Sequence, residues 1–427
     1  MSSMYRVLLR NLCTSVQSTA AAAEACTEPA VTKLRSITKS LYRENDFDRL
    51  VEKFKKASEI DRFRTNSGIY ETMVRRLASA KRFNLVEEIL EEQTKYKDIT
   101  KEGFSARLIR LYGVSGMFEN AHKLFDGLPE RNCTRTVLSF NALLAAYLHS
   151  KKFDMVDRLF KELPSKLSIE PDSVSYNTVI KAFCEMGSFD SAFSMIEEME
   201  NKGVKPDLIT YNTLLDELYG KGRYSEGERI WSEMEKKNVT PDIRSYNARL
   251  VGLAGEKKMK EAVELIEKMR NEGVKPDRFS INAVIKGFVD EKNLDEAKKW
   301  YSEIANTDCE PNKTTFKMLI PFLCEKGDLK TAIEVCKVIF NSQSRVDDSL
   351  LQLVVDRLVK ESMVSEAKEI VELGRTCRYK LKLPADKPLH GICPRMILFA
   401  PYKLVFSFLV YNSYYPFELV LAFLSLG

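Results

Sequence analysis

An asparagine recurs along the middle of this 427-residue chain at a spacing of 35 or 36 residues. An amide side chain both donates and accepts hydrogen bonds, so it can pair with the edge of a nucleic-acid base. An aspartate, or once a second asparagine, follows each of them directly after a proline. The repeated asparagines are Asn141, Asn177, Asn212, Asn247 and Asn282, and the residues that follow the prolines are Asp172, Asp207, Asp242, Asp277 and Asn312.

Both residue types also have a purely structural explanation. Asparagine caps helices, and an acid near a helix N-terminus is favoured by the helix dipole. A hydroxyl residue stands two residues before the repeated position and can supply the cap instead, namely Ser175, Thr210, Ser245, Ser280 and Thr315. Four further units lack the asparagine but still need a first helix. We therefore favour ligand contact for the asparagines and leave the aspartates open between ligand contact and capping.

Other site chemistry is poorly supported. The three histidines, His122, His149 and His390, lie far apart, and none of the nine cysteines forms a Cys-x-x-Cys pair. These facts argue against a metal site, a redox pair and catalysis by histidine. Cys184 and Cys324 occupy apolar helical positions, where we expect buried thiols. We predict no catalytic residues, no metal, no cofactor and no small-molecule substrate.

The 35-residue spacing also predicts the helices that position the repeated asparagines and aspartates. In residues 173–207, apolar side chains follow helical spacing, Gly187 interrupts them, and the spacing then resumes. Each unit is therefore predicted to form two helices. The second helix must end before the next proline, and Gly203, Asn238 and Gly273 suit the left-handed conformation of such an end, with Asp308 a weaker equivalent.

The 35-residue frame extends beyond the units that carry asparagine. A small buried position in the second helix is held by Val86, Ala121, Ala332 and Ala367 in the outer copies. We predict an all-α, right-handed solenoid of nine helix-turn-helix repeats over 67–382, in which each helix pair buries its apolar face on its neighbours. The repeats are 67–101, 102–136, 137–172, 173–207, 208–242, 243–277, 278–312, 313–347 and 348–382, and a less regular helical pair is expected at 31–66.

The string Val-Ser-Tyr-Asn-Thr-Val-Ile at 174–180, closing with Gly-Val-Lys-Pro-Asp at 203–207, resembles the pentatricopeptide repeat family. Ile-Thr-Tyr-Asn-Thr-Leu-Leu at 209–215 repeats it. The resemblance implies a right-handed superhelix in which each repeat reads one base of single-stranded RNA. The unbroken 35-residue spacing fits the plain P class. The His-x-Glu and Cys-x-x-Cys motifs of the family's editing branch are missing, so we do not expect an enzyme.

Carried over residue by residue, the resemblance implies five pairs: Asn141 with Asp172, Asn177 with Asp207, Asn212 with Asp242, Asn247 with Asp277, and Asn282 with Asn312. The first four pairs are of the type that the family uses for uracil, and the fifth is of the type for cytosine or either pyrimidine. Because the family runs its N-terminal repeats toward the 5′ end, the implied sequence is UUUU followed by C or U. The family packs a side chain between bases three positions before each asparagine, here Leu138, Val174, Ile209, Arg244 and Phe279. Four outer pairs match no standard type: Ala106 with Thr136, Glu71 with Lys101, Lys317 with Asp347, and Gln352 with Lys382.

Charge is unevenly distributed along the repeats. The chain has 66 Lys and Arg against 61 Asp and Glu, whereas residues 137–312 hold 26 against 31. The region with the asparagines is therefore acidic between basic flanks. We expect base edges and stacking to hold RNA there more than phosphate attraction, and so a shallow dependence of binding on salt.

The two ends differ in composition from the repeats. Residues 1–30 contain Arg6 and Arg10 but no acid before Glu24, which is typical of a transit peptide, and we favour a mitochondrial over a plastid address. Residues 383–427 form a hydrophobic tail too interrupted for a membrane span. We interpret this tail as the product of an imperfect gene model, with a membrane-associated or partner-binding tail as the alternative.

Two functions follow from these observations. The first is an organellar RNA-binding factor acting in post-transcriptional RNA metabolism on a single-stranded, pyrimidine-rich transcript. The alternative is a structural component of the small subunit of the mitochondrial ribosome, with ribosomal RNA and ribosomal proteins as partners. Neither function involves binding to DNA.

Overall fold

The computed structural model describes residues 28–307, 309–342 and 344–383. Within these ranges the regular structure comprises 21 α-helices and three short 3₁₀-helices. Most of the expected transit peptide, nearly all of the hydrophobic tail, and the positions of Asp308 and His390 lie outside the described residues. The expected all-α architecture is confirmed.

Each of the nine ranges between 67 and 382 holds one helix pair. The first helices are α5 (Ser67–Ser79), α7 (Glu102–Val114), α9 (Val137–His149), α11 (Ser173–Met186), α13 (Leu208–Gly220), α15 (Ile243–Gly255), α17 (Arg278–Asp290), α19 (Lys313–Lys326) and α21 (Asp348–Lys360). The second helices are α6 (Phe83–Gln93), α8 (Phe118–Asp126), α10 (Phe153–Leu167), α12 (Phe189–Asn201), α14 (Tyr224–Lys236), α16 (Met259–Asn271), α18 (Leu294–Glu303), α20 (Leu329–Asn341) and α22 (Val364–Thr376). Short 3₁₀-helices follow three second helices: η1 (Lys97–Thr100), η2 (Pro129–Arg131) and η3 (Ile304–Asn306).

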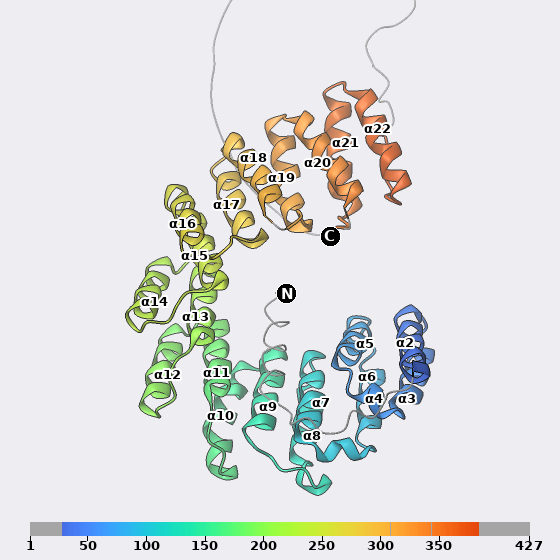
Figure 1. Ribbon diagram of the computed structural model, residues 1–427, viewed down its shortest axis with the longest axis vertical. Coiled ribbons are helices and arrows are strands. Elements are labelled where there is room, and N and C mark those ends of the chain that lie inside the picture. The colour runs from blue at the N-terminus through green and yellow to red at the C-terminus, as the bar shows by residue number, and fades with distance from the viewer. Residues whose placement is uncertain (1–27, 308, 343, 384–427) are drawn as a thin grey trace, which may run out of the picture.

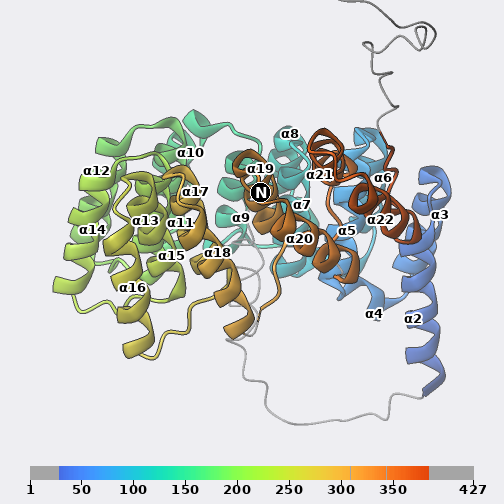
Figure 2. The same ribbon diagram turned by 90° about the horizontal axis from the view of Figure 1, so that it is seen from above.

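The helix pairs stack side by side into a solenoid that curves through an open arc (Figure 1). Successive first helices contact one another from α5 to α21, and along the middle of the chain they line the inner side of the arc, with α12, α14 and α16 outside them (Figures 1 and 2). Side chains that project inward from successive first helices therefore form continuous rows along one surface.

The turns use the residues that the sequence predicts. Gly203, Asn238 and Gly273 have φ of 75°, 57° and 79°, and Gly187 between the two helices of its unit has φ 78°. These left-handed values end a helix without the clash that most side chains would suffer there. The second helices end accordingly at Asn201, Lys236 and Asn271, ahead of each proline.

One small side chain per second helix lies fully buried against the first helices, which allows the two layers to approach closely. These residues are Val86, Ala121, Val156, Ala192, Gly227, Ala262, Ala297, Ala332 and Ala367. Cys184 and Cys324 are buried in the same core, and burial raises the pKa of these thiols to about 12 and about 11. They are packing residues, as expected.

The N-terminal region differs from the expected helical pair at 31–66. It contains three helices, α2 (Glu28–Arg43), α3 (Phe47–Ser58) and the short α4 (Asp61–Arg64). Buried Arg64 explains the extra turn: its guanidinium donates to the carbonyl of Ser58 at 2.7 Å and to the carboxylates of Asp61 and Asp98, both at 2.5 Å. A buried cation needs such partners, and α4 places it between α3 and η1.

Candidate nucleic-acid interface

The structure brings the members of the predicted pairs together. Each asparagine is the fifth residue of its first helix, and in four of the five the amide reaches the aspartate that caps the first helix of the next repeat. The distance from Asn Nδ2 to Asp Oδ1 is 2.9 Å for Asn141–Asp172, 3.5 Å for Asn177–Asp207, 3.0 Å for Asn212–Asp242 and 3.1 Å for Asn247–Asp277. Each pair therefore bridges two neighbouring repeats at the inner surface.

The aspartates, and not the hydroxyl residues, cap the helices. Asp172, Asp207, Asp242 and Asp277 are the N-cap residues of α11, α13, α15 and α17. The carboxylate accepts the backbone N–H of the third helical residue, and that residue's hydroxyl accepts the backbone N–H of the aspartate. The expectation that Ser175 and its equivalents are the caps is therefore wrong. Asp172 holds the capping position because its extended backbone (φ −105°, ψ −178°) directly precedes the first helical residue, whereas Ser175 already lies within the helix.

The hydroxyl residues instead connect the cap to the asparagine of the preceding repeat. Ser175 donates to Oδ1 of Asn141 at 2.5 Å, and Ser245 and Ser280 donate to Asn212 and Asn247, both at 2.6 Å. These bonds fix which way the amide points. Among the four asparagines of the Asn–Asp pairs, Asn177 differs, because its Oδ1 is buried without a hydrogen-bond partner.

This hydrogen-bond arrangement decides which groups are left for a ligand. In three of the four Asn–Asp pairs, the asparagine oxygen accepts a hydrogen bond from a hydroxyl. One amide hydrogen of the same asparagine is donated to Oδ1 of the aspartate. The second amide hydrogen and the aspartate Oδ2 have no partner among the described residues. Each such pair therefore offers one donor beside one acceptor.

The fifth pair offers a different pattern. Asn312 caps α19 through its Oδ1, which accepts the backbone N–H groups of Thr314 and Thr315 at 3.0 and 3.1 Å. Asn282 Oδ1 accepts the hydroxyl of Thr315 at 2.8 Å. Since both amide oxygens are occupied, this pair offers a ligand two N–H donors, one from each amide.

The side chains expected to pack between bases flank these pairs unevenly. Leu138 and Phe279 are 39% and 50% exposed, although apolar side chains of their size are usually buried. Val174, Ile209 and Arg244 are partly buried. Asn212 and Asn282 are buried, with 3% and 7% exposure, whereas Asn141, Asn177 and Asn247 are partly buried.

The outer pairs use their side chains for internal contacts. Lys317 and Lys313 form ion pairs with Asp347 at 2.9 and 2.7 Å, and these hydrogen bonds lower the pKa of that carboxyl. Gln352 bonds the backbone N–H and carbonyl of Lys382 at 2.9 and 2.7 Å.

At the other end of the solenoid, Glu71 pairs with Arg75 at 2.7 Å. Ala106 is buried, and Thr136 caps α9 while its hydroxyl and backbone N–H donate to Glu102. None of the four outer pairs repeats the Asn–Asp arrangement.

Sequence reasoning missed one residue on this face. Asp216 lies one helical turn beyond Asn212 on α13, and its Oδ2 is buried without a hydrogen-bond partner. Burial raises the pKa of this carboxyl to about 6. The four-residue spacing from Asn212 was the available signal, but its burial depends on neighbouring repeats.

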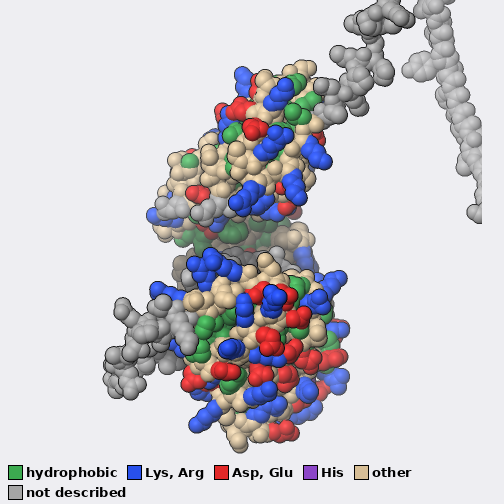
Figure 3. Space-filling view, turned by 90° about the vertical axis from the view of Figure 1, so that its right-hand side faces the viewer, with side chains coloured by type: hydrophobic (Ala, Val, Ile, Leu, Met, Phe, Trp, Pro, Cys, Tyr) green, Lys and Arg blue, Asp and Glu red, His purple; other side chains and the backbone are tan. Residues whose placement is uncertain are grey.

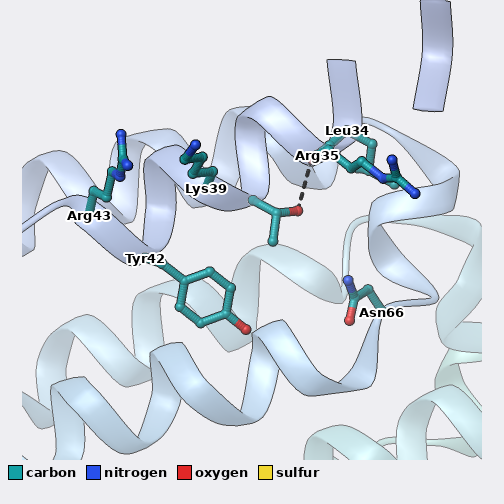
Figure 4. Close-up of a pocket in the computed structure, with 7 residues that line it drawn as sticks. Leu34, Arg35, Lys39, Tyr42, Arg43 and Asn66 are labelled. Carbon is teal, nitrogen blue, oxygen red and sulfur yellow. Dashed lines mark hydrogen bonds between the residues drawn. The ribbon is translucent and has the colours of Figure 1, made fainter. Parts of the chain in front are cut away.

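The described residues offer little for other chemistry. They contain no group of three or more His, Cys, Asp or Glu placed to hold a metal ion. No helix among them is long and apolar enough to cross a membrane. A shallow hollow of about 440 Å³ at α2 is lined by Arg35, Lys39 and Arg43 at four-residue spacing, with Tyr42 and Asn66 (Figure 4). The residues that line it include no Asp, Glu, His or Cys.

The repeats match known sequence families. A model described as PPR repeat family matches residues 171–220, 206–255, 243–290 and 277–325, and one described as PPR repeat matches 107–133 and 138–166.

Known proteins of the same kind are also similar. The small ribosomal subunit protein mS78 (rPPR3a) of Arabidopsis thaliana is 55% identical over 211 residues, which cover 48% of this chain and 53% of that relative. The chain thus spans about half the length of this relative. A mitochondrial pentatricopeptide repeat-containing protein of Arabidopsis thaliana is 42% identical over 135 residues, covering 31% of this chain and 32% of that relative.

The crystal structure of the pentatricopeptide repeat protein PPR10 from maize is also similar, with a TM-score of 0.46 and 18% identity over 82% of this chain and 59% of that one. The repeated motifs, the nine stacked helix pairs and the matches to both repeat models agree. This chain belongs to the pentatricopeptide repeat family.

Proposed function

We propose that this chain is a non-catalytic, RNA-binding component of the small subunit of the mitochondrial ribosome. The observation that carries the proposal is the 55% identity over 211 residues to mS78, a small ribosomal subunit protein. The similarity to a mitochondrial relative supports the compartment. These likenesses favour the ribosomal role over that of a free transcript factor.

The inner surface of the solenoid is the proposed RNA-binding surface. Viewed toward the open side of the arc, the molecule is hollowed between its two ends, and basic side chains stand at both edges of this hollow (Figure 3). The Asn–Asp pairs lie on first helices that line the arc. A strand of RNA that follows this surface would present its bases to successive repeats.

The hydrogen-bonding pattern of the pairs supports recognition of pyrimidines. Uracil has an N3–H donor next to carbonyl acceptors, so it can donate to the free Oδ2 of aspartate and accept the free amide hydrogen of asparagine. The two donors of Asn282 and Asn312 suit the neighbouring acceptors N3 and O2 of cytosine. The proposed order, from 5′ to 3′, is UUUU followed by C or U.

A binding titration tests the assignment of these residues. Replacing Asn177, Asn212 and Asn247 together by Ala should abolish binding of a U-rich oligonucleotide, since three of the five base contacts are removed. The control is a triple replacement on the outer helices α12, α14 and α16, of Glu198, Glu233 and Glu267 by Ala, which should leave binding unchanged. Binding that survives the asparagine changes would contradict the assignment.

A free transcript-binding factor is the second candidate. It is supported by the row of Asn–Asp pairs with unused donors and acceptors, because such pairs suit a single-stranded site as well as ribosomal RNA. Ribosome association separates the two candidates: a transcript factor would be recovered with RNA that is free of ribosomal proteins.

A further inference from the structure

A second row of side chains lies one helical turn beyond the asparagines. Residues four apart on a helix share a face, so these positions follow the same inner surface. We call them the turn row: Arg75, Arg110, Ala145, Lys181, Asp216, Val251 and Lys286. Its first two members are arginines, and they stand in the two repeats that precede the units with asparagine.

Close packing of α7 and α9 brings basic groups together at this end. A Cβ atom on Gly113 would lie 2.2 Å from the Cα atom of Ala146, so only glycine permits this approach. Arg110 stands three residues before Gly113 on α7, and His149 three residues after Ala146 on α9. Arg110 and His149 therefore lie on opposite sides of this contact, each about one helical turn away from it.

The electrostatics of His149 show that Arg75 also reaches this region. The pKa of His149 is lowered to about 4, first by burial and then by the positive charges of Arg75 and Arg110, while Glu71 opposes this shift. A neutral imidazole thus lies near two guanidinium groups from α5 and α7. Two successive repeats contribute the positive charges, and the third contributes the imidazole beside them.

Arg75 is in addition accessible to an anion. Its side chain is 47% exposed, and it pairs with Glu71 at 2.7 Å. An exposed ion pair of this kind contributes little to stability, so a phosphate can replace the carboxylate at small cost. Glu71 and Ala106 occupy the base-reading positions of these two repeats, and neither residue completes an Asn–Asp pair there.

We propose that Arg75 and Arg110, beside neutral His149, form a binding site for backbone phosphates of the RNA on the 5′ side of the bases held by the Asn–Asp pairs. This inference rests on the proposed RNA-binding function. A guanidinium presents a fork of N–H donors that matches phosphate oxygens. The acidic repeats 137–312 would then read bases, while the preceding repeats hold the backbone.

The test compares two oligonucleotides, UUUUC and AAAAUUUUC, on the full chain and on Arg75→Ala/Arg110→Ala. With wild type, the 5′ extension should strengthen binding and steepen the plot of log K against log salt by about 1.4, because each phosphate contact on a single strand contributes about 0.7. That slope corresponds to a roughly 7-fold larger loss of affinity between 50 and 200 mM salt. The double variant should lose both gains and still bind UUUUC.

The matched control is Arg158→Ala/Arg375→Ala, which removes two arginines that are 66% exposed and ion-paired on α10 and α22. It lowers the net charge equally but should keep the effect of the extension. Arg75→Lys/Arg110→Lys should retain most of the salt slope. Ala145→Arg should raise the slope by about 0.7.

Two results would overturn the inference. In the first, the alanine double variant keeps the gain in affinity and salt slope that the 5′ extension gives to wild type. In the second, the control variant loses this gain as completely as the alanine double variant does. If wild type binds UUUUC but gains nothing from the extension, the phosphate site fails while the base-reading surface stands. If wild type binds neither oligonucleotide, the RNA-binding proposal itself fails.

Discussion

Asp242 is the residue at which capping and base recognition can be separated. Its Oδ1 accepts the backbone N–H groups of Arg244 and Ser245 at 3.0 Å each and the amide of Asn212 at 3.0 Å. Its Oδ2 is the atom proposed to accept from a base. Replacement by Asn keeps a capping oxygen and converts this second position from an acceptor to a donor.

The two roles predict different magnitudes. Asn and Asp are about equally good N-caps, so Asp242→Asn should change the free energy of unfolding by less than about 0.5 kcal/mol. Asp242→Ala removes the cap, worth about 1 kcal/mol, and leaves the nearly buried amide of Asn212 without its acceptor, which costs about 1–3 kcal/mol. The alanine variant should therefore be less stable by about 2–4 kcal/mol.

Base recognition should respond to the asparagine variant. This pair is proposed to face the third base of UUUUC, so the discriminating ligands are UUUUC and UUCUC. A complementary pair of hydrogen bonds discriminates by about 1–3 kcal/mol, or roughly 5- to 150-fold in affinity. Wild type should prefer U at the third position, and Asp242→Asn should lose or reverse that preference.

Fluorescence anisotropy titrations of both oligonucleotides measure the preference, and thermal unfolding of the same samples measures stability. If Asp242→Asn keeps the wild-type preference for UUUUC with unchanged stability, Asp242 only caps α15, and the proposed base contact is refuted.

Three further predictions follow from particular contacts. Gly113→Ala should destabilise the fold by about 1–3 kcal/mol through the clash with Ala146, whereas Gly103→Ala on the same helix meets nothing within 4 Å and should be neutral or stabilising in urea unfolding. Asp216 has a folded-state pKa raised to about 6, so it binds its proton more tightly when folded and destabilises the fold increasingly as pH rises from about 4 to about 6. Asp216→Asn should therefore gain stability over wild type above pH 6, by at most roughly 3 kcal/mol, and a difference independent of pH would contradict this. Finally, binding of UUUUC alone should depend only weakly on salt, because residues 137–312 hold 26 basic against 31 acidic side chains, and a steep slope in titrations at several salt concentrations would argue against base-dominated binding.

Much of the fold could be predicted because one pattern repeats. A 35-residue step with apolar positions at helical spacing has few physical solutions other than stacked helix pairs. Local turn chemistry was equally predictable, as the left-handed φ of Gly203 and Asn238 shows. The α2–α4 region was not, since α4 depends on the burial of Arg64 against Asp98, a residue of a later unit.

The sequence predicted which residues form the site but not the hydrogen bonds between them. The 35-residue spacing identified Asn141 and Asp172 as repeated residues, the family resemblance made them partners, and they are bonded at 2.9 Å. Two oxygen-bearing side chains, Asp172 and Ser175, could both cap α11, and only the backbone geometry shows that the carboxylate does so. The convergence of Arg110 with His149 depends on the close approach at Gly113, which no short-range pattern reveals.

Sedimentation of the mitochondrial small ribosomal subunit in a high-salt gradient tests the central proposal most directly. The tagged full chain should remain with the subunit through the high-salt wash, at a constant ratio to known small-subunit proteins across the peak. Complete release to the top of the gradient, or recovery only with RNA free of ribosomal proteins, would contradict the ribosomal role.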